Sequence, residues 1–215
     1  MIPHGTFHDG VGKGSGMDVD LLAALFGFAL TASMTPGPNN VMLMASGANF
    51  GVRRSLPHAA GITIGFSVMI ALVGHGLGRA FDLWPSLRIG LAVVSAGYLA
   101  WLAWKIATAA PAGSRGQASR PLSLLQAAGF QWVNPKAWTM AVSAITLFAK
   151  GTTGPFVVAA VFGAVSVVST ATWLVAGTQV RRLLDSPGRL RAFNRAMTAL
   201  LVASLWPAVG PLLRG

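Results

Sequence analysis

Six long apolar runs constrain the fold of this chain more than any other feature. They extend over roughly Leu21–Ala48, Pro57–Gly78, Leu87–Ala107, Leu122–Ala149, Pro155–Val180 and Ala196–Leu213. A helix needs about 20 apolar residues to cross the hydrocarbon core of a bilayer, so each run is long enough for one crossing. Only 10% of the residues are charged, against about 25% in a soluble domain. The sequence therefore predicts an all-α integral membrane protein with six transmembrane helices.

The cations stand at the ends of the apolar runs, which is typical of membrane topology and not of nucleic-acid binding. By the rule that counts cations near the ends of each span, about ten fall on one set of loops and about five on the other. The richer set is Arg53, Arg54, Lys105, Arg115, Arg120, Arg181, Arg182, Arg189, Arg191 and Arg195. Because the richer side faces the cytoplasm, we expect a multi-pass protein of the inner membrane with both termini periplasmic.

Residues 1–16 are polar, rich in glycine and aperiodic, and we expect a disordered N-terminal extension, with Met17 as the hypothetical natural start. Residues 17–215 are predicted to form a single domain of six helices. Its two halves, about 17–109 and 121–215, are joined by a cytoplasmic linker at about 110–120. The chain has no cysteine, which excludes disulfides and thiolate metal sites.

Two of the runs are interrupted by proline and polar residues at similar depths. "SMTPGPNNVMLM" (Ser33–Met44) lies in the first run and "VNPK" (Val133–Lys136) in the fourth. Three runs separate the two breaks, so the chain would cross in opposite directions there and the halves would form inverted three-helix repeats. Secondary transporters often combine such repeats with broken helices. Two unrelated kinks are the alternative, because proline kinks are common in membrane helices.

The first break frees hydrogen-bonding groups in apolar surroundings. Pro36 and Pro38 have no N–H, and proline suits the first turn of a helix. A half-helix that starts near Pro38 would direct the N–H groups of Asn39, Asn40 and Val41 into the gap, where they attract anions. The two side-chain amides add donors and acceptors that suit a zwitterion. Helix capping alone is the alternative role of these asparagines.

The second break carries a lysine near the middle of its run. A lysine at the centre of a membrane helix costs about 2.5–3.5 kcal/mol on insertion, so it usually faces a polar cavity. We expect Lys136 and Asn134 to complete the substrate site with Asn39 and Asn40. A lysine that extends to the membrane interface is the alternative. No run contains an Asp or Glu, which excludes a carboxylate proton carrier within the membrane.

His58 and His75 are the other titratable candidates. They lie near opposite ends of the second run, too far apart to share a metal, and we predict no metal site. Either imidazole could sense pH, but we expect both to be interfacial and ordinarily hydrogen-bonded.

Three stretches resemble the LysE/RhtB family of amino-acid exporters. "MTPGPNNVMLMASGANFGVRRSLPHAAGITIGFSV" (Met34–Val68) resembles its first-repeat motif, and "FQWVNPKAW" (Phe130–Trp138) its second. "AGYLAWLAWKIATA" (Ala96–Ala109) is most similar to the cysteine/O-acetylserine exporter branch. The similarity extends from about Met17 to the end of the chain.

The resemblance implies a secondary exporter of neutral amino acids or their derivatives, of the cysteine/O-acetylserine or homoserine/threonine kind. It would work by alternating access and use the proton-motive force, without ATP, cofactor or metal. The residues expected to break the helices and gate the cavity are Pro36, Gly37, Pro38, Pro135, Gly61 and Gly65. The residues that match the cytoplasmic loop of the family are Gly51, Arg53 and Arg54.

Three alternatives stay open. A membrane enzyme would need a nucleophile and a base together, but Lys136 and Ser143, at positions i and i+7 of one helix, stack about 10 Å apart. A non-catalytic scaffold subunit would explain the small residues along the helices, and a different small-solute or ion transporter of the same superfamily would explain the breaks. The predicted partners are an amino acid, protons and the lipid bilayer; the glycine-rich faces also permit a homodimer.

Overall fold

The computed structural model describes residues 19–79, 83–84, 86–108, 120–150, 153–184 and 186–204, which are helical and contain no strand. The elements in chain order are α1 (Val19–Met34), α2 (Pro38–Phe50), α3 (Val52–Gly74), η1 (Leu77–Arg79), α5 (Ser86–Ala107), α6 (Leu124–Phe130), η2 (Gln131–Val133), α7 (Pro135–Phe148), α8 (Pro155–Arg181) and α9 (Pro187–Ala203). The predicted disordered extension and almost all of the predicted linker lie outside the described residues.

Three of these helices are long and apolar enough to cross a membrane. They are α3, the segment Ile89–Ala107 of α5, and α8, with mean hydropathies of 1.8, 1.5 and 1.9. Helices α1 and α2 pass the same test together as one span that bends by 56° between them. The described part of the chain therefore supports a helical membrane protein with three or four candidate spans.

The sixth run differs most from its prediction. Helix α9 begins at Pro187 instead of Ala196, because the hydroxyl of Ser186 caps its first turn by accepting from the N–H of Arg189 at 3.3 Å. The arginines at 189, 191 and 195, which we expected in a loop, consequently lie on the helix. Helix α3 likewise begins at Val52, so Pro57 stands inside its N-terminal part.

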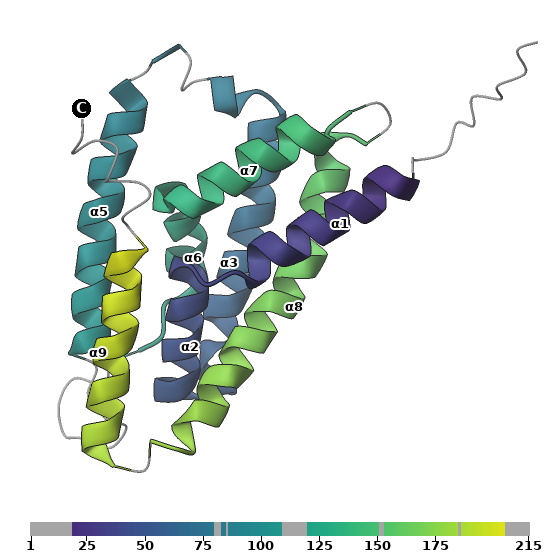
Figure 1. The fold of residues 1–215 in the computed structure, drawn as a ribbon. Coiled ribbons are helices and arrows are strands. Elements are labelled where there is room, and N and C mark those ends of the chain that lie inside the picture. Colours follow the sequence, from purple (N-terminus) through teal and green to yellow (C-terminus); the bar gives the residue numbers. More distant parts are fainter. Residues whose placement is uncertain are drawn as a thin grey trace, which may run out of the picture.

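Two apolar clusters form the interior, one on each side of the helix breaks. One cluster joins α2, α5 and α9 around Leu43, Leu99 and Leu201, while the other joins α1, α7 and the first half of α8 around Leu25 and Phe162. Helices α3 and α8 contribute to both clusters, and α8 runs along α2 on one side of the break and α1 on the other (Figure 1). Polar groups from the breaks therefore meet between two apolar layers.

Most of the basic residues that the structure describes gather at one end of the molecule. Helices α2, α5 and α8 end there, and α3 and α9 begin there (Figure 1). Gly51 makes the turn between α2 and α3 with φ of 78°, a conformation that glycine adopts without strain. Arg53 and Arg54 follow it and are exposed. We refer to this end as the basic end.

Candidate functional site

Both predicted breaks are present, and each is followed by a helix that starts on a proline. Helix α1 ends at Met34 and α2 starts at Pro38, while α7 starts at Pro135 after the 3₁₀ turn η2. Proline fits the first helical position because the N–H that it lacks has no acceptor there. The sequence therefore located the half-helix start near Pro38 and the position of the second break at Val133–Lys136.

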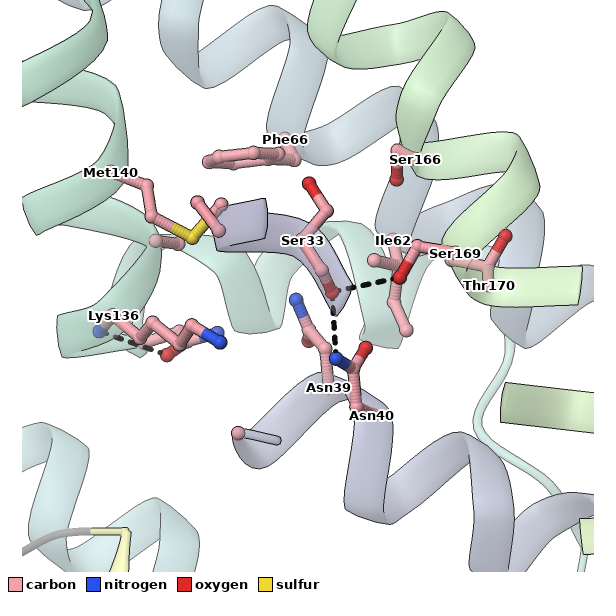
Figure 2. Close-up of a pocket in the computed structure, with 14 residues that line it drawn as sticks. Ser33, Asn39, Asn40, Ile62, Phe66, Lys136, Met140, Ser166, Ser169 and Thr170 are labelled. Atoms are coloured by element: carbon pink, nitrogen blue, oxygen red, sulfur yellow. Dashed lines mark hydrogen bonds between the residues drawn. The ribbon is translucent and has the colours of Figure 1, made fainter. Parts of the chain in front are cut away.

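The carbonyl oxygens at the end of α1 are held by side chains from three other helices. The Asn40 amide donates to the carbonyls of Ser33 at 2.8 Å and Thr35 at 2.9 Å. The Ser169 hydroxyl, on α8, also donates to the Ser33 carbonyl at 2.8 Å, so that Ser33 lies between the two donors (Figure 2). The third donor is Lys136, whose Nζ reaches the Thr35 carbonyl at 2.6 Å. The carbonyl groups freed by the break thus accept hydrogen bonds from side chains of α2, α7 and α8.

Lys136 joins the second break to the first. Its side chain is half-buried, and its ammonium stands at the carbonyl end of α1, where the helix dipole favours a positive charge. The aliphatic part of the side chain runs beside Gly37, where a Cβ would lie 2.7 Å from the Lys136 Cδ. Gly37 therefore leaves the space that Lys136 occupies.

The remaining amides of the two breaks also engage each other. Asn39 Nδ2 donates to Gln131 Oε1 at 2.9 Å, and Gln131 Nε2 donates back to Asn39 Oδ1 at 3.2 Å. Asn134 is almost wholly buried and caps α7, since its side-chain oxygen accepts from the N–H of Lys136 at 3.2 Å. Asn40 thus has the capping role that the sequence left open for it, Asn134 caps its own helix, and Asn39 bridges the breaks.

A cavity of about 40 Å³ lies where these groups meet, with room for on the order of three water molecules. All four predicted substrate-binding residues, Asn39, Asn40, Asn134 and Lys136, line it together with Gly37. The rest of the wall is apolar or hydroxyl-bearing and consists of Ala32, Ser33, Ile62, Phe66, Ala137, Met140, Ser166, Ser169 and Thr170. Figure 2 shows Lys136, Asn39 and Asn40 on one side of the cavity and Phe66 and Met140 on another, with the labelled serines and threonine of α8 on a third.

The predicted gating residues do not all lie at the cavity between the breaks. Pro36 is exposed at the first break, and Pro135 faces a neighbouring, larger cavity between α3, α5 and α7. Gly61 and Gly65 lie within the continuous helix α3, away from both breaks. A Cβ on Gly61 would collide with the carbonyl of Leu124, and one on Gly65 would lie 2.6 Å from the Cα of Ala128. These two glycines therefore let α3 and α6 approach closely, and a role in gating stays a prediction.

Two expectations were wrong. The N–H of Val41 does not point into the gap but donates to the carbonyl of Gly37 at 3.0 Å, because Gly37 is the N-cap of α2 and this is the first bond of the helix. His58 is not interfacial: its side chain is 2% exposed, and neither ring nitrogen has a hydrogen-bond partner. The packing of α3 against α2 and α6, which a linear pattern does not contain, decides the burial of His58.

The sequence reasoning missed five polar residues of the cavity. Gln131, Ser33, Ser166, Ser169 and Thr170 all line it or hydrogen-bond to its lining. Their signal is present in the sequence: Gln131 is an amide inside an apolar run, and "SVVST" (Ser166–Thr170) places three hydroxyls in a run without charge. Ser166 and Ser169 are nearly inaccessible to solvent, so these hydroxyls face the interior.

A polar cavity between broken apolar helices is typical of membrane transporters, and the comparisons with known proteins agree. A family model described as LysE type translocator matches residues 30–211. The chain therefore belongs to the LysE family of translocators, which confirms the resemblance seen in the two motifs.

Curated relatives match along nearly their whole length. The cysteine/O-acetylserine efflux protein of Escherichia coli K12 is 31% identical over 193 residues, which cover 86% of this chain and 96% of that protein. The protein of the same name from Klebsiella pneumoniae is 30% identical over 190 residues, with 86% and 95% covered. No solved structure matches the chain.

Proposed function

We propose that this protein is a secondary active exporter of neutral amino acids or their derivatives, with cysteine and O-acetylserine as the first substrates to test. The observation that carries the proposal is the single polar cavity to which both helix breaks contribute, with Lys136 from one break bonded to a carbonyl of the other. The family and the names of the relatives support the same function. A scaffold subunit has no need for such a cavity.

The groups around the cavity suit a zwitterion. Helix geometry leaves the N–H groups of Asn39 and Asn40 without an acceptor inside α2, and the N-terminus of a helix attracts a carboxylate. The Lys136 ammonium would complete the carboxylate site by exchanging the Thr35 carbonyl for the substrate oxygen. A side-chain oxygen of Asn39 or Asn134 would then accept from the substrate ammonium.

Binding requires the cavity to enlarge. Pockets that enclose small molecules usually measure about 300 Å³ or more, whereas this cavity measures about 40 Å³. We infer that Asn39 and Gln131 separate, and that Lys136 leaves Thr35, as the half-helices move apart. Pro36, Gly37, Pro38 and Pro135 would allow this movement, since the backbone at each break is already free of the helical ladder.

The proposed architecture has six crossings arranged as inverted three-helix repeats, residues 17–109 and 121–215. Helices α1 and α2 would be the first crossing and α6, η2 and α7 the fourth, each broken at a corresponding point. The basic end would face the cytoplasm, so both termini would be periplasmic. Export would be coupled to protons, and Lys136 is a candidate proton carrier because no run contains a carboxylate.

Transport by purified protein in liposomes tests the proposal. Vesicles are loaded with labelled O-acetylserine, cysteine, homoserine or threonine, a proton gradient of either sign is imposed, and release is followed. Gradient-dependent release of one or a few of these compounds is the expected result. Absence of release from folded, inserted protein would favour the scaffold, and release of an unrelated solute or ion would favour a different transporter of the superfamily.

A further inference from the structure

A second cavity lies at the basic end, separate from the cavity between the breaks. It measures about 60 Å³ and is enclosed by α2, α3, the end of α5 and the segment that begins at Arg120. Its lining includes His58, Lys105 and Arg120, together with Ser46 and Asn49. None of these residues lines the cavity between the breaks.

His58 is the polar group in this cavity that the protein leaves unsatisfied. It is 2% exposed, and neither Nδ1 nor Nε2 has a hydrogen-bond partner. Its polar neighbours are occupied elsewhere: the Ser46 hydroxyl is bonded to Ser55 at 2.8 Å, and Asn49 donates to Asn194 at 2.9 Å. A buried polar group without a partner costs about 1–3 kcal/mol. A ligand that hydrogen-bonds to this imidazole would remove that cost.

The charge of the lining indicates the sign of that partner. Lys105 and Arg120 both face the cavity, and the Lys105 ammonium also lies 4.9 Å from the centre of the Trp101 ring. All five acidic residues of the chain are aspartates, and the only one among the described residues, Asp20, lies at the start of α1. The described part of the chain thus supplies two cations and a hydrogen-bond donor at this cavity, but no carboxylate.

The size of the cavity indicates a small ligand. A volume of about 60 Å³ holds on the order of four water-sized groups, which is the number of non-hydrogen atoms in acetate. We propose that this cavity is a second binding site, which holds a small carboxylate between His58, Lys105 and Arg120. The ligand would be the carboxylate of the exported amino acid, an assignment that rests on the proposed export function.

The consequence would be a site that collects substrate at the basic end before it reaches the breaks. Its cations attract a carboxylate from solution, and charge-assisted hydrogen bonds then hold it. The neutral imidazole donates from one nitrogen to the carboxylate.

NMR of the whole protein, labelled with ¹⁵N-histidine and held in nanodiscs, tests the site. The chain has four histidines, and His58→Gln identifies the signal of His58. The titrations with acetate, O-acetylserine and chloride are made in the Lys136→Met background, so that the cavity between the breaks does not contribute. A failure of export would therefore leave this measurement unaffected.

We expect acetate and O-acetylserine to shift the His58 signal and to compete with each other. Arg120→Gln should weaken both by about tenfold, the effect of losing one charge-assisted hydrogen bond. The matched control, Arg53→Gln, removes the same charge from the basic end but not from the cavity lining, and should leave the affinity unchanged.

Three results would overturn the proposal or part of it. If none of the three anions shifts the His58 signal, the cavity holds water alone and the site does not exist. Equal weakening by Arg53→Gln and Arg120→Gln would mean that the general charge of the basic end attracts the anion without a built site. Binding of chloride as tight as that of acetate, without competition from O-acetylserine, would show that the site does not select a carboxylate and does not bind the exported amino acid.

Discussion

The two helix breaks look alike in sequence but are stabilised in different ways. At the first, the carbonyls of Ser33 and Thr35 each accept two hydrogen bonds, and the donors come from α2, α7 and α8. At the second, the cap is local: Asn134 caps its own helix, and its N–H donates to the carbonyl of Gln131 at 3.3 Å. The amide of Gln131 does reach a distant group, Asn39 of the first break. The first break therefore depends on the tertiary fold, whereas the second largely supports itself.

This difference suggests which break moves. Because its donors belong to three separate helices, the first break changes its bonding whenever α7 or α8 shifts relative to α1. The second break keeps its cap during such a shift, so Lys136 moves together with α7. We infer that the second break acts on the first, and the following predictions test that order.

Lys136→Met should have the largest effect, because Lys136 is the only charged side chain among the described residues that bonds from one break to the other. We expect transport in liposomes to fall by about 100-fold or more, the factor that corresponds to a hydrogen bond of a charged group worth about 3 kcal/mol. Folding should survive, since the Thr35 carbonyl keeps its bond from Asn40 at 2.9 Å. The unfolding temperature in detergent checks this second point.

Lys150→Met is the matched control for that experiment. Lys150 follows the end of α7 and is exposed, so its loss removes an equal charge far from the cavity and should leave transport unchanged. Normal transport by the Lys136→Met protein would remove Lys136 from the substrate site.

Asn40→Ser and Asn134→Ser compare the two breaks directly. Asn40→Ser should lower the free energy of unfolding by about 2 kcal/mol, because it removes two hydrogen bonds worth about 1 kcal/mol each. Asn134→Ser should cost no more than about 0.5 kcal/mol, since serine is a good N-cap. Equilibrium unfolding of both variants in the same detergent measures the difference, and equal losses would contradict the proposed asymmetry.

The amide pair Asn39–Gln131 should couple the breaks by about 1 kcal/mol. Either Asn39→Leu or Gln131→Leu alone leaves the other amide without its partner, whereas the double variant leaves neither. A double-mutant cycle on the free energy of unfolding therefore should show the double variant to be more stable than the sum of the two single changes predicts. Additive effects would mean that the bridge contributes nothing to the contact between the breaks.

The positions of the breaks were predictable because proline and asparagine act through local chemistry. Helix α2 begins at Pro38 as expected, and α7 begins at Pro135 within the predicted second break, since a missing N–H restricts the position of proline whatever the tertiary fold is. The joint cavity followed from the correspondence of the two motifs, and Asn39, Asn40, Asn134 and Lys136 do line it.

The partners of these residues could not be predicted from the sequence. Gln131 and Ser169 lie 92 and 136 residues from the groups to which they bond at the first break, and only the packing of α6 and α8 brings them there. The burial of His58 has the same origin. The start of α9 was missed for a different reason. Its capping signal, Ser186 and Pro187, precedes the apolar run, and the arginines between the two are typical of a loop.

Ser169→Ala should have the smallest effect and tests the part that α8 has in the first break. It removes one of the two donors on the Ser33 carbonyl, which keeps the Asn40 bond at 2.8 Å, so the free energy of unfolding should fall by only about 0.5 kcal/mol. Ser166→Ala is the matched control, because its hydroxyl is bonded to Thr63 at 3.2 Å and not to the break. If Ser169→Ala slows transport while Ser166→Ala does not, α8 takes part in opening the break. If both variants transport normally, the movement of α7 alone has to release the Ser33 and Thr35 carbonyls.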